Sequence, residues 1–180
     1  MNLPNKLTMA RVIMIPFFVI FMLTGWGGEA SKWISLAIFI VASLTDLLDG
    51  HIARKHNLVT NFGKFMDPLA DKLLVCAAMV CLVATGQLAA WIVIIIISRE
   101  FIISGFRLVA AEKGVTIAAS YWGKVKTFVQ MAMSIFLVFH FQAEVFRIIE
   151  SILIYASVIL TIISLVDYIY KNRGVMKDVR

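Results

Sequence analysis

The stretch KWISLAIFIVASLTDLLDGHIARK, residues 32–55, is a long apolar run that leads into two aspartates and a group of basic residues. A helix that spans a membrane needs about 20 mostly apolar residues. Residues 32–55 meet this requirement, and their charged side chains gather toward the carboxyl end of the run. The pattern predicts a membrane-spanning helix with carboxylates near one end, where ionisable residues usually serve a function.

The composition of the whole chain has the same character. Of 180 residues, 61% are hydrophobic and 16% are charged, and the mean hydropathy is +0.92. A soluble domain is about half apolar and about a quarter charged. The polar side chains are too few to cover a water-facing surface, which excludes a soluble globular protein and a disordered chain. Cys76 and Cys81 lie in one apolar run without a CxxC spacing, so a disulfide scaffold is excluded as well.

Six apolar segments predict spanning helices, at residues 12–25, 32–55, 67–85, 88–109, 124–141 and 147–170. Pro68 would then occupy the first position of the third helix, where proline is favoured. Residues 1–11 form an N-terminal amphipathic segment, and no cleavage site follows that would make it a signal peptide. We therefore predict an all-α integral membrane bundle of six transmembrane helices that forms a single domain over residues 1–180.

The basic residues predict the orientation of this bundle. Six spans place both termini on one side of the membrane, and that side collects 15 of the 17 Lys and Arg residues. Positively charged loops face the cytoplasm. We expect a multi-pass protein with cytoplasmic termini and a cytoplasm-facing active site. The net charge of +6 then reflects anionic head groups of membrane lipid as partners, and no nucleic acid.

Four aspartates stand out near the predicted cytoplasmic boundary. Asp46 and Asp49 are spaced i,i+3, and Asp67 and Asp71 are spaced i,i+4, so each pair shares one face of a helix. The two helices follow one another along the chain and are antiparallel neighbours, so the four carboxylates can meet at one depth. Like charges repel there unless a cation offsets them, and carboxylate oxygens suit Mg²⁺ or Mn²⁺.

Structural roles for the individual aspartates remain open at this point. Asp67 precedes Pro68 and could only cap a helix. Asp71 could pair with Lys64 or Lys72, and the first two aspartates could pair with Arg54.

Residues between the aspartates point to a phosphate ligand. Gly50 and Ala53 are small residues one turn apart, which let a ligand or helix approach the backbone closely. Arg54 lies one turn beyond Gly50 and could hold a phosphate through two hydrogen bonds. Metal ions, an arginine and an accessible backbone together suit a diphosphate substrate.

The combined motif runs Asp46-x2-Asp49-Gly50-x2-Ala53-Arg54-x8-Gly63-x3-Asp67-x3-Asp71, with eight fixed positions over 26 residues. It resembles the signature of the CDP-alcohol phosphatidyltransferases at every position. Three further motifs look like the bacterial phosphatidylglycerophosphate synthases of that family: Asn5-Lys6-Leu7-Thr8-x2-Arg11, Arg99-Glu100-Phe101 with Ser104-Gly105-x-Arg107, and Gly123-Lys124-x-Lys126-Thr127.

The resemblance implies a transferase of phospholipid biosynthesis in the bacterial cytoplasmic membrane. Such an enzyme transfers the phosphatidyl group of CDP-diacylglycerol to sn-glycerol 3-phosphate, and releases phosphatidylglycerophosphate, the precursor of phosphatidylglycerol and cardiolipin, with CMP. It implies a homodimer and two divalent ions, Mg²⁺ or Mn²⁺. It assigns Asp46, Asp49 and Asp67 as metal ligands and Asp71 as ligand and general base. Its CDP-diacylglycerol site corresponds to Asn5, Thr8, Gly50, Arg54 and Thr60.

The acceptor carries a phosphate, so a second basic pocket is expected. Arg107, Lys124, Lys126 and Thr127 lie near the cytoplasmic ends of two predicted helices and are the candidates. These cations could instead only flank the membrane and contact lipid head groups. Arg99 lies deeper beside Glu100, and an ion pair or a substrate contact is equally consistent with its position.

Three other functions remain as alternatives. The same chemistry could use another acceptor: inositol phosphate, serine, or phosphatidylglycerol as in a cardiolipin synthase. A membrane prenyltransferase also uses metal and diphosphate, but it usually has two Asp-rich motifs on a longer chain. A cation transporter would spread its acids through the depth of the membrane, whereas here they gather at one face.

Overall fold

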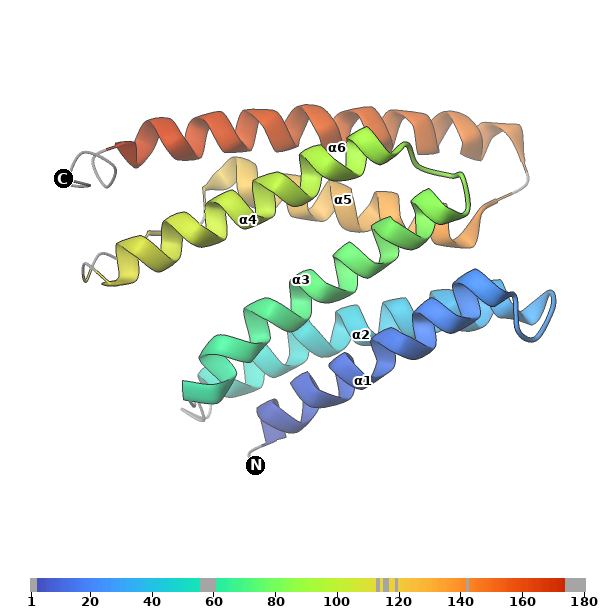
Figure 1. The fold of residues 1–180 in the computed structure, drawn as a ribbon, viewed down its shortest axis with the longest axis horizontal. Coiled ribbons are helices and arrows are strands. Elements are labelled where there is room, and N and C mark those ends of the chain that lie inside the picture. The colour runs from blue at the N-terminus through green and yellow to red at the C-terminus, as the bar shows by residue number, and fades with distance from the viewer. Residues whose placement is uncertain are drawn as a thin grey trace. The chain divides into compact units, whose positions relative to one another are not determined.

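The computed structural model describes residues 3–55, 61–112, 114, 117, 118, 120–141 and 143–173. The side chains of these residues are described as well, except those of residues 3, 4, 46–55, 61–65, 67, 68 and 112. The described chain is all helical, with α1 (Leu3–Thr24), α2 (Ala30–Lys55), α3 (Asn61–Ala84), α4 (Ala90–Glu112), α5 (Tyr121–Phe139) and α6 (Glu144–Lys171) (Figure 1). The prediction of an all-α fold with six helices is confirmed for this part of the chain.

The helices form two compact units. The first contains α1, α2 and α3, and the segment Leu137–His140 at the end of α5 and just after it belongs to the same unit. The second contains α4, the rest of α5 and α6.

In the first unit, α1 packs against both α2 and α3. Phe18 and Phe39 form part of this core, with ring centroids 5.8 Å apart, and both are fully buried. The turn between α1 and α2 contains Gly25, Gly27 and Gly28 in the left-handed region of backbone conformation. Residues with a Cβ atom rarely adopt this backbone conformation. Glycine therefore permits the tight turn after which α2 runs back along α1.

In the second unit, α4 packs against α6. Phe106 of α4 meets the ring of Tyr168 of α6 edge to face, at 6.2 Å between centroids. The inner face of α6 is unusually polar, because Ser157, Thr161 and Ser164 are buried on it. Polar groups that are taken out of water cost free energy unless they are bonded, so this face needs an explanation beyond packing.

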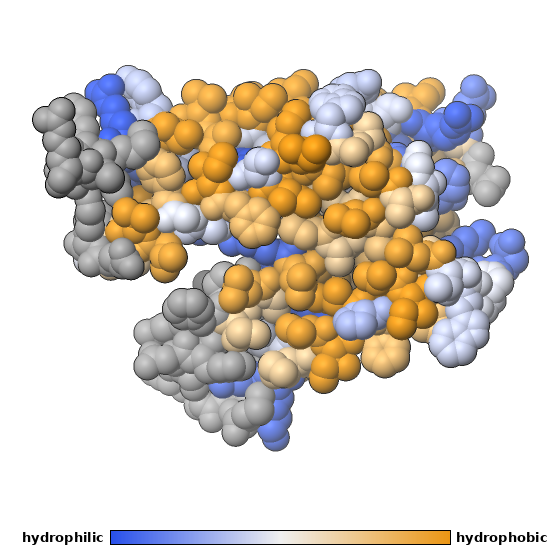
Figure 2. Space-filling view, in the orientation of Figure 1, coloured by the Kyte–Doolittle hydropathy of each residue, from blue (hydrophilic) through white to orange (hydrophobic). Residues whose placement is uncertain are grey.

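Among the residues that the structure describes, two helical segments are long and apolar enough to cross a bilayer, Asn5–Thr24 and Glu144–Lys171, and the part of α2 at Ala30–Thr45 is a shorter apolar stretch. Large apolar side chains are exposed on all six helices, among them Phe17, Trp33, Val80, Ile94, Phe128 and Ile152. On the face that Figure 2 shows, apolar side chains cover much of the described surface. These features are those of a membrane protein, and six spans remain a prediction.

Two predicted helix starts differ most from those in the structure. The N-terminal amphipathic segment is not a separate element, because α1 begins at Leu3 and continues through it, with its buried side carrying Asn5, Thr8 and Arg11. Helix α3 begins at Asn61, so Pro68 lies inside the helix and not at its first position. Both errors have one cause: hydropathy locates the apolar part of a helix, whereas backbone hydrogen bonding extends the helix into polar sequence.

Candidate functional site

The four aspartates lie on two neighbouring helices of the first unit. Asp46 and Asp49 are in α2, Asp67 and Asp71 are in α3, and α2 contacts α3. Asp49 lies six residues before the end of α2 and Asp67 six residues after the start of α3, which is about 9 Å of helix in each case. The helix bounds thus support the prediction that the two pairs of aspartates lie at one depth. Asp71 is half-buried, whereas the other three side chains lie outside the description.

The predicted nucleotide site is described in part. Asn5 and Thr8 are buried on one face of α1, beside fully buried Arg11. Each of these three side chains has a polar partner in the structure. The backbone of Gly50 and Arg54 is helical and places them one turn apart on α2. Their side-chain positions, and Thr60 as a whole, lie outside the described residues.

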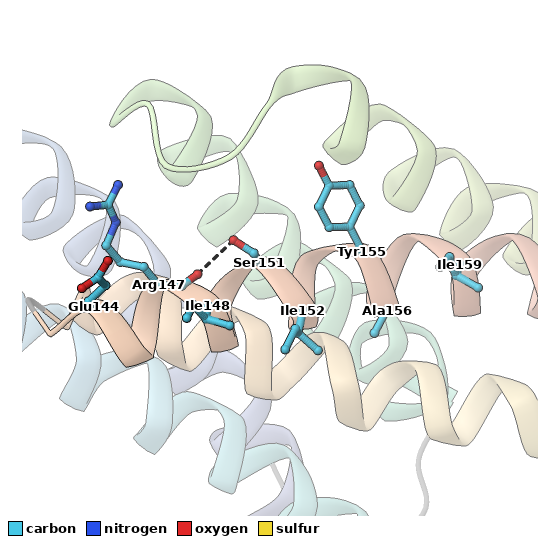
Figure 3. Close-up of a pocket in the computed structure, with 8 residues that line it drawn as sticks. All are labelled: Glu144, Arg147, Ile148, Ser151, Ile152, Tyr155, Ala156 and Ile159. Carbon is cyan, nitrogen blue, oxygen red and sulfur yellow. Dashed lines mark hydrogen bonds between the residues drawn. The ribbon is translucent and has the colours of Figure 1, made fainter.

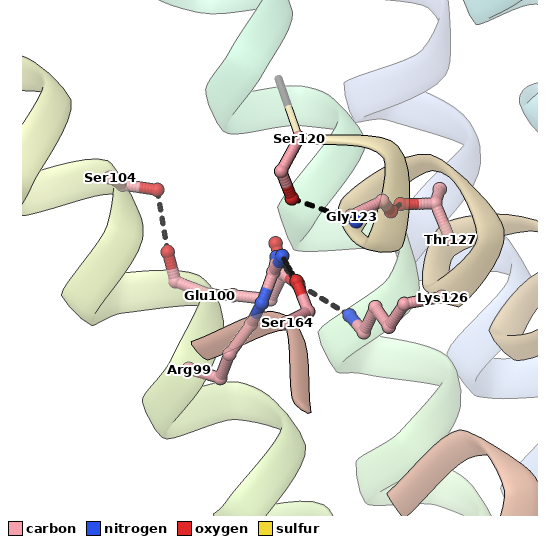
Figure 4. Close-up of polar contacts among 8 residues, drawn as sticks. All are labelled: Arg99, Glu100, Ser104, Ser120, Gly123, Lys126, Thr127 and Ser164. Carbon is pink, nitrogen blue, oxygen red and sulfur yellow. Dashed lines mark hydrogen bonds and ion pairs between the residues drawn. The ribbon is translucent and has the colours of Figure 1, made fainter. Parts of the chain in front are cut away.

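A buried polar cluster occupies the second unit, where α4, α5 and α6 meet (Figure 4). The Arg99 Nη1 atom donates to Glu100 Oε1 at 2.9 Å, and Lys126 Nζ donates to the same oxygen. Arg99 Nη2 donates to Ser164 Oγ of α6. The side chains of Arg99, Glu100 and Lys126 are 9%, 21% and 2% exposed. The ion pair between Arg99 and Glu100, one of the two roles left open above, is therefore confirmed.

Gly123 lets the N-terminus of α5 approach this cluster. A Cβ atom at this position would lie 3.3 Å from Arg99 Nη2 and 3.7 Å from Ser164 Oγ. The Gly123 N–H donates to Ser120 Oγ at 3.1 Å, and Ser120 immediately precedes α5. Ser120 is thus the N-cap of α5, a role that serine fills well. The cap and the missing side chain together fix the first turn of α5 against Arg99.

Lys126 is the predicted acceptor residue that the structure brings into the cluster. Arg107, Lys124 and Thr127 are exposed, and no described contact joins them to Glu100. Arg107 stands over the Tyr168 ring, with Cζ 6.0 Å from the centroid. The Thr127 hydroxyl donates to the Gly123 carbonyl at 2.9 Å within α5.

Sequence reasoning missed the pairing of Glu100 with Lys126. The two residues are 26 positions apart on different helices, so helical spacing could not find them. One signal was present: a lysine inside an apolar helix needs an acid near it, and Glu100 is an acid in another apolar helix of the same unit.

A separate open groove of about 760 Å³ runs along one face of α6. Arg147 lies at one end, and Ile148, Ile152, Tyr155 and Ile159 follow along the helix (Figure 3). It contains none of the predicted site residues, and its lining is mainly apolar.

The sequence comparison decides the family. Over residues 1–163 the chain matches the family of CDP-alcohol phosphatidyltransferases. The chain belongs to this family. The match includes all of the first unit, most of the second and all four aspartates.

Full-length relatives of this CDP-alcohol phosphatidyltransferase carry one enzyme name. A Bacillus subtilis protein named CDP-diacylglycerol–glycerol-3-phosphate 3-phosphatidyltransferase is 45% identical over 188 residues, covering 98% of this chain and 97% of the relative. Proteins with the same name from Haemophilus influenzae and Rickettsia typhi are 44% and 39% identical, covering 98% and 93% of this chain and 96% and 94% of the relatives.

Members of the CDP-alcohol phosphatidyltransferase family generally depend on a divalent metal. The donor set fits such an ion, because two pairs of aspartates lie at similar distances from neighbouring ends of two adjacent helices, and aspartates offer only hard oxygen ligands. The described side chains hold no other group of three or more His, Cys, Asp or Glu residues that could bind a metal. The aspartates of α2 and α3 are therefore the candidate metal centre.

Proposed function

We propose that this chain transfers the phosphatidyl group of CDP-diacylglycerol to sn-glycerol 3-phosphate and yields phosphatidylglycerophosphate and CMP. The observation that carries the proposal is full-length similarity to relatives named for this activity, at 44–45% identity over 98% of the chain. The helical placement of the aspartates supports the same chemistry.

The reaction takes place at the aspartates of α2 and α3. Asp46, Asp49, Asp67 and Asp71 hold two divalent ions, Mg²⁺ or Mn²⁺. When bound, these ions supply the positive charge that stabilises a diphosphate under attack and its leaving group. Asp71 is also the general base and takes the proton from the acceptor hydroxyl, the role of a carboxylate within hydrogen-bond reach of that proton. Its half-buried position on α3 suits a group that must meet a water-soluble substrate.

The cytidine nucleotide binds beside the metals, between the aspartates and the start of α1. Asn5 and Thr8 offer side-chain hydrogen bonds from the polar face of α1. Gly50 allows a close approach to the backbone of α2, Arg54 binds the diphosphate, and Thr60 is the fifth residue proposed for the CDP-diacylglycerol site. Contact of α1 with both aspartate-bearing helices supports this arrangement.

The acceptor phosphate binds to the basic residues of α4 and α5. Lys126 contributes a buried cation, while Arg107 and Lys124 supply exposed ones, and Thr127 supplies a hydroxyl. The exposed cations attract the acceptor, and the buried one binds it in an environment that strengthens electrostatic attraction.

The protein acts as a single catalytic domain in the bacterial cytoplasmic membrane. Six spans, cytoplasmic termini and a cytoplasm-facing site leave the acyl chains of the substrate in lipid and admit nucleotide and acceptor from the cytosol. The chain works as a homodimer. Exposed apolar side chains on all six helices support its burial in lipid.

A transfer assay on the detergent-purified protein tests this function. CDP-diacylglycerol and Mg²⁺ are supplied with one radiolabelled acceptor at a time: glycerol 3-phosphate, inositol phosphate, serine or phosphatidylglycerol. We expect lipid product and CMP only with glycerol 3-phosphate. Product from another acceptor alone would keep the aspartate chemistry and refute the acceptor. No product from any acceptor, in protein shown to be folded, would refute the transferase assignment.

A further inference from the structure

Glu100 is the acid at which two cations from different helices meet. Its Oε1 atom accepts hydrogen bonds from Arg99 of α4 and Lys126 of α5 (Figure 4). Arg99 is in turn anchored to α6 through Ser164. We propose that Glu100 is a positioning residue, which holds Arg99 and Lys126 so that both bind the phosphate of the acceptor. This inference rests on the proposed function, because it takes glycerol 3-phosphate as the ligand.

Burial makes the position of Lys126 depend on its partners. The side chain is 2% exposed, and taking an ammonium group out of water costs several kcal/mol unless it is paired. A lysine side chain also has about 2 kcal/mol of rotamer entropy to lose when it is fixed. The contact with Glu100 offsets part of both costs and keeps Nζ near the guanidinium of Arg99. Loss of the negative charge at Glu100 would therefore displace the cation.

One nitrogen of Arg99 has no hydrogen-bond partner among the described residues. Its Nη1 and Nη2 atoms are both bonded, to Glu100 and Ser164. Its Nε atom is buried, and the structure gives it no hydrogen-bond partner among the described residues. A buried donor without an acceptor costs about 1–3 kcal/mol. A phosphate oxygen that accepts from Nε would remove that cost, which gives a reason for the unpartnered Nε of a buried arginine.

Glu100 is the most exposed of the three charged side chains. It is 21% exposed, more than either cation that it holds. We take this side of the cluster as the entry for the acceptor, whose phosphate would reach Arg99 and Lys126 past Glu100. A purely structural ion pair does not require the unpartnered Nε atom of Arg99, and breaking it would raise the KM for both substrates equally.

Steady-state transfer kinetics with each substrate varied separately test the inference. Glu100→Gln removes the charge and keeps the shape, while Glu100→Asp keeps the charge and retracts it by one methylene. Glu29→Gln is the matched control, because Glu29 pairs with Lys32 at 3.3 Å on the surface and is 97% exposed. Lys126→Met and the double variant Glu100→Gln with Lys126→Met complete a double-mutant cycle.

For Glu100→Gln we expect the KM for glycerol 3-phosphate to rise about tenfold or more, the scale of one charge-assisted hydrogen bond. The KM for CDP-diacylglycerol should stay within about twofold, since only acceptor binding is lost. Glu100→Asp should show a smaller rise, and Glu29→Gln none. In the Lys126→Met background, the Glu100 substitution should add much less, because its effect acts in part through Lys126.

Two results would overturn the inference while the proposed function stands. One is an unchanged KM for glycerol 3-phosphate in Glu100→Gln. The other is an equal rise in both KM values with a lower melting temperature, which marks a structural pair. If Glu100→Gln does not fold, Glu100→Asp decides between the same outcomes. A wild-type protein that does not use glycerol 3-phosphate would refute the proposed function, and this inference with it.

Discussion

Substitution of Gly123 by alanine has two opposing effects on stability. Alanine favours the helix, and its Cβ atom clashes with Arg99. Alanine is more favourable than glycine in a helix interior by about 1 kcal/mol, and the gain is smaller in the first turn, where Gly123 lies. The new Cβ would lie 3.3 Å from Arg99 Nη2 and 3.4 Å from Ser120 Oγ. Both neighbours must therefore move by a few tenths of an ångström.

The clash should outweigh the gain, because Arg99 is held at both ends of its guanidinium. Overpacking a well-filled site costs about 1–3 kcal/mol. Arg99 can yield only by weakening its bond to Ser164 or to Glu100, and a hydrogen bond to a charged group contributes about 1.5–3 kcal/mol. The net result is a loss of about 0–2 kcal/mol of stability. The larger effect should fall on the KM for glycerol 3-phosphate, raised about three- to tenfold by displacement of Arg99.

The assay combines thermal unfolding in detergent with transfer kinetics, and Gly105→Ala is its control. Gly105 lies in α4 with no atom within 4 Å of a Cβ built there, so alanine should stabilise the helix by up to about 1 kcal/mol without changing either KM. Gly123→Val should be worse than Gly123→Ala. The reasoning is refuted if Gly123→Ala raises the melting temperature as Gly105→Ala does and keeps the wild-type KM for the acceptor.

Three further predictions concern the metal centre and the buried hydroxyls. Asp71→Asn should lower turnover about 100-fold or more while the folded protein still binds CDP-diacylglycerol; near-normal turnover would exclude Asp71 as the base. EDTA should abolish transfer, and Mg²⁺ or Mn²⁺ should restore it; full activity in EDTA would argue against a metal centre at the aspartates. The Thr161 hydroxyl is buried without a hydrogen-bond partner among the described residues, so Thr161→Val should stabilise the protein by about 1 kcal/mol in thermal unfolding. A lower melting temperature would show that this hydroxyl has a bound partner.

Helix existence could be predicted from the sequence because each helix contains an apolar run of sufficient length. The boundaries could not, since α3 begins at Asn61 in polar sequence where hydropathy gives no signal. The aspartate pairs could be assigned to facing helices because i,i+3 and i,i+4 spacing is local and consecutive helices pack antiparallel. The Glu100–Lys126 contact depends on how α4 and α5 are rotated about their axes, which no local pattern encodes.

The direction of burial on α6 is the reverse of that in a soluble helix. The six buried residues of α6 include Glu150, Ser157, Thr161 and Ser164, while Ile152 and Ile159 are exposed. In a soluble protein the apolar stripe of a helix faces the core. Lipid accepts apolar side chains, so the apolar stripe of a membrane helix can face outward. Polar residues at helical spacing then mark the side that faces the protein interior. Lys126, Gln130 and Ser134, each four residues apart and all buried, mark the inner face of α5 in the same way.

This reversal explains why the polar interior is the place to look for substrate contacts. Burying serine, threonine, lysine and arginine costs free energy that an apolar interior would avoid. A membrane protein with two water-soluble reaction partners, an acceptor and a nucleotide, needs such surfaces inside the protein. The buried polar residues include Asn5, Thr8 and Arg11 on α1 in the first unit, and Arg99 and Lys126 in the second, and we propose that these five meet that need. Polar periodicity within apolar helices is thus the sequence signal that would have placed Arg99 and Lys126 inside.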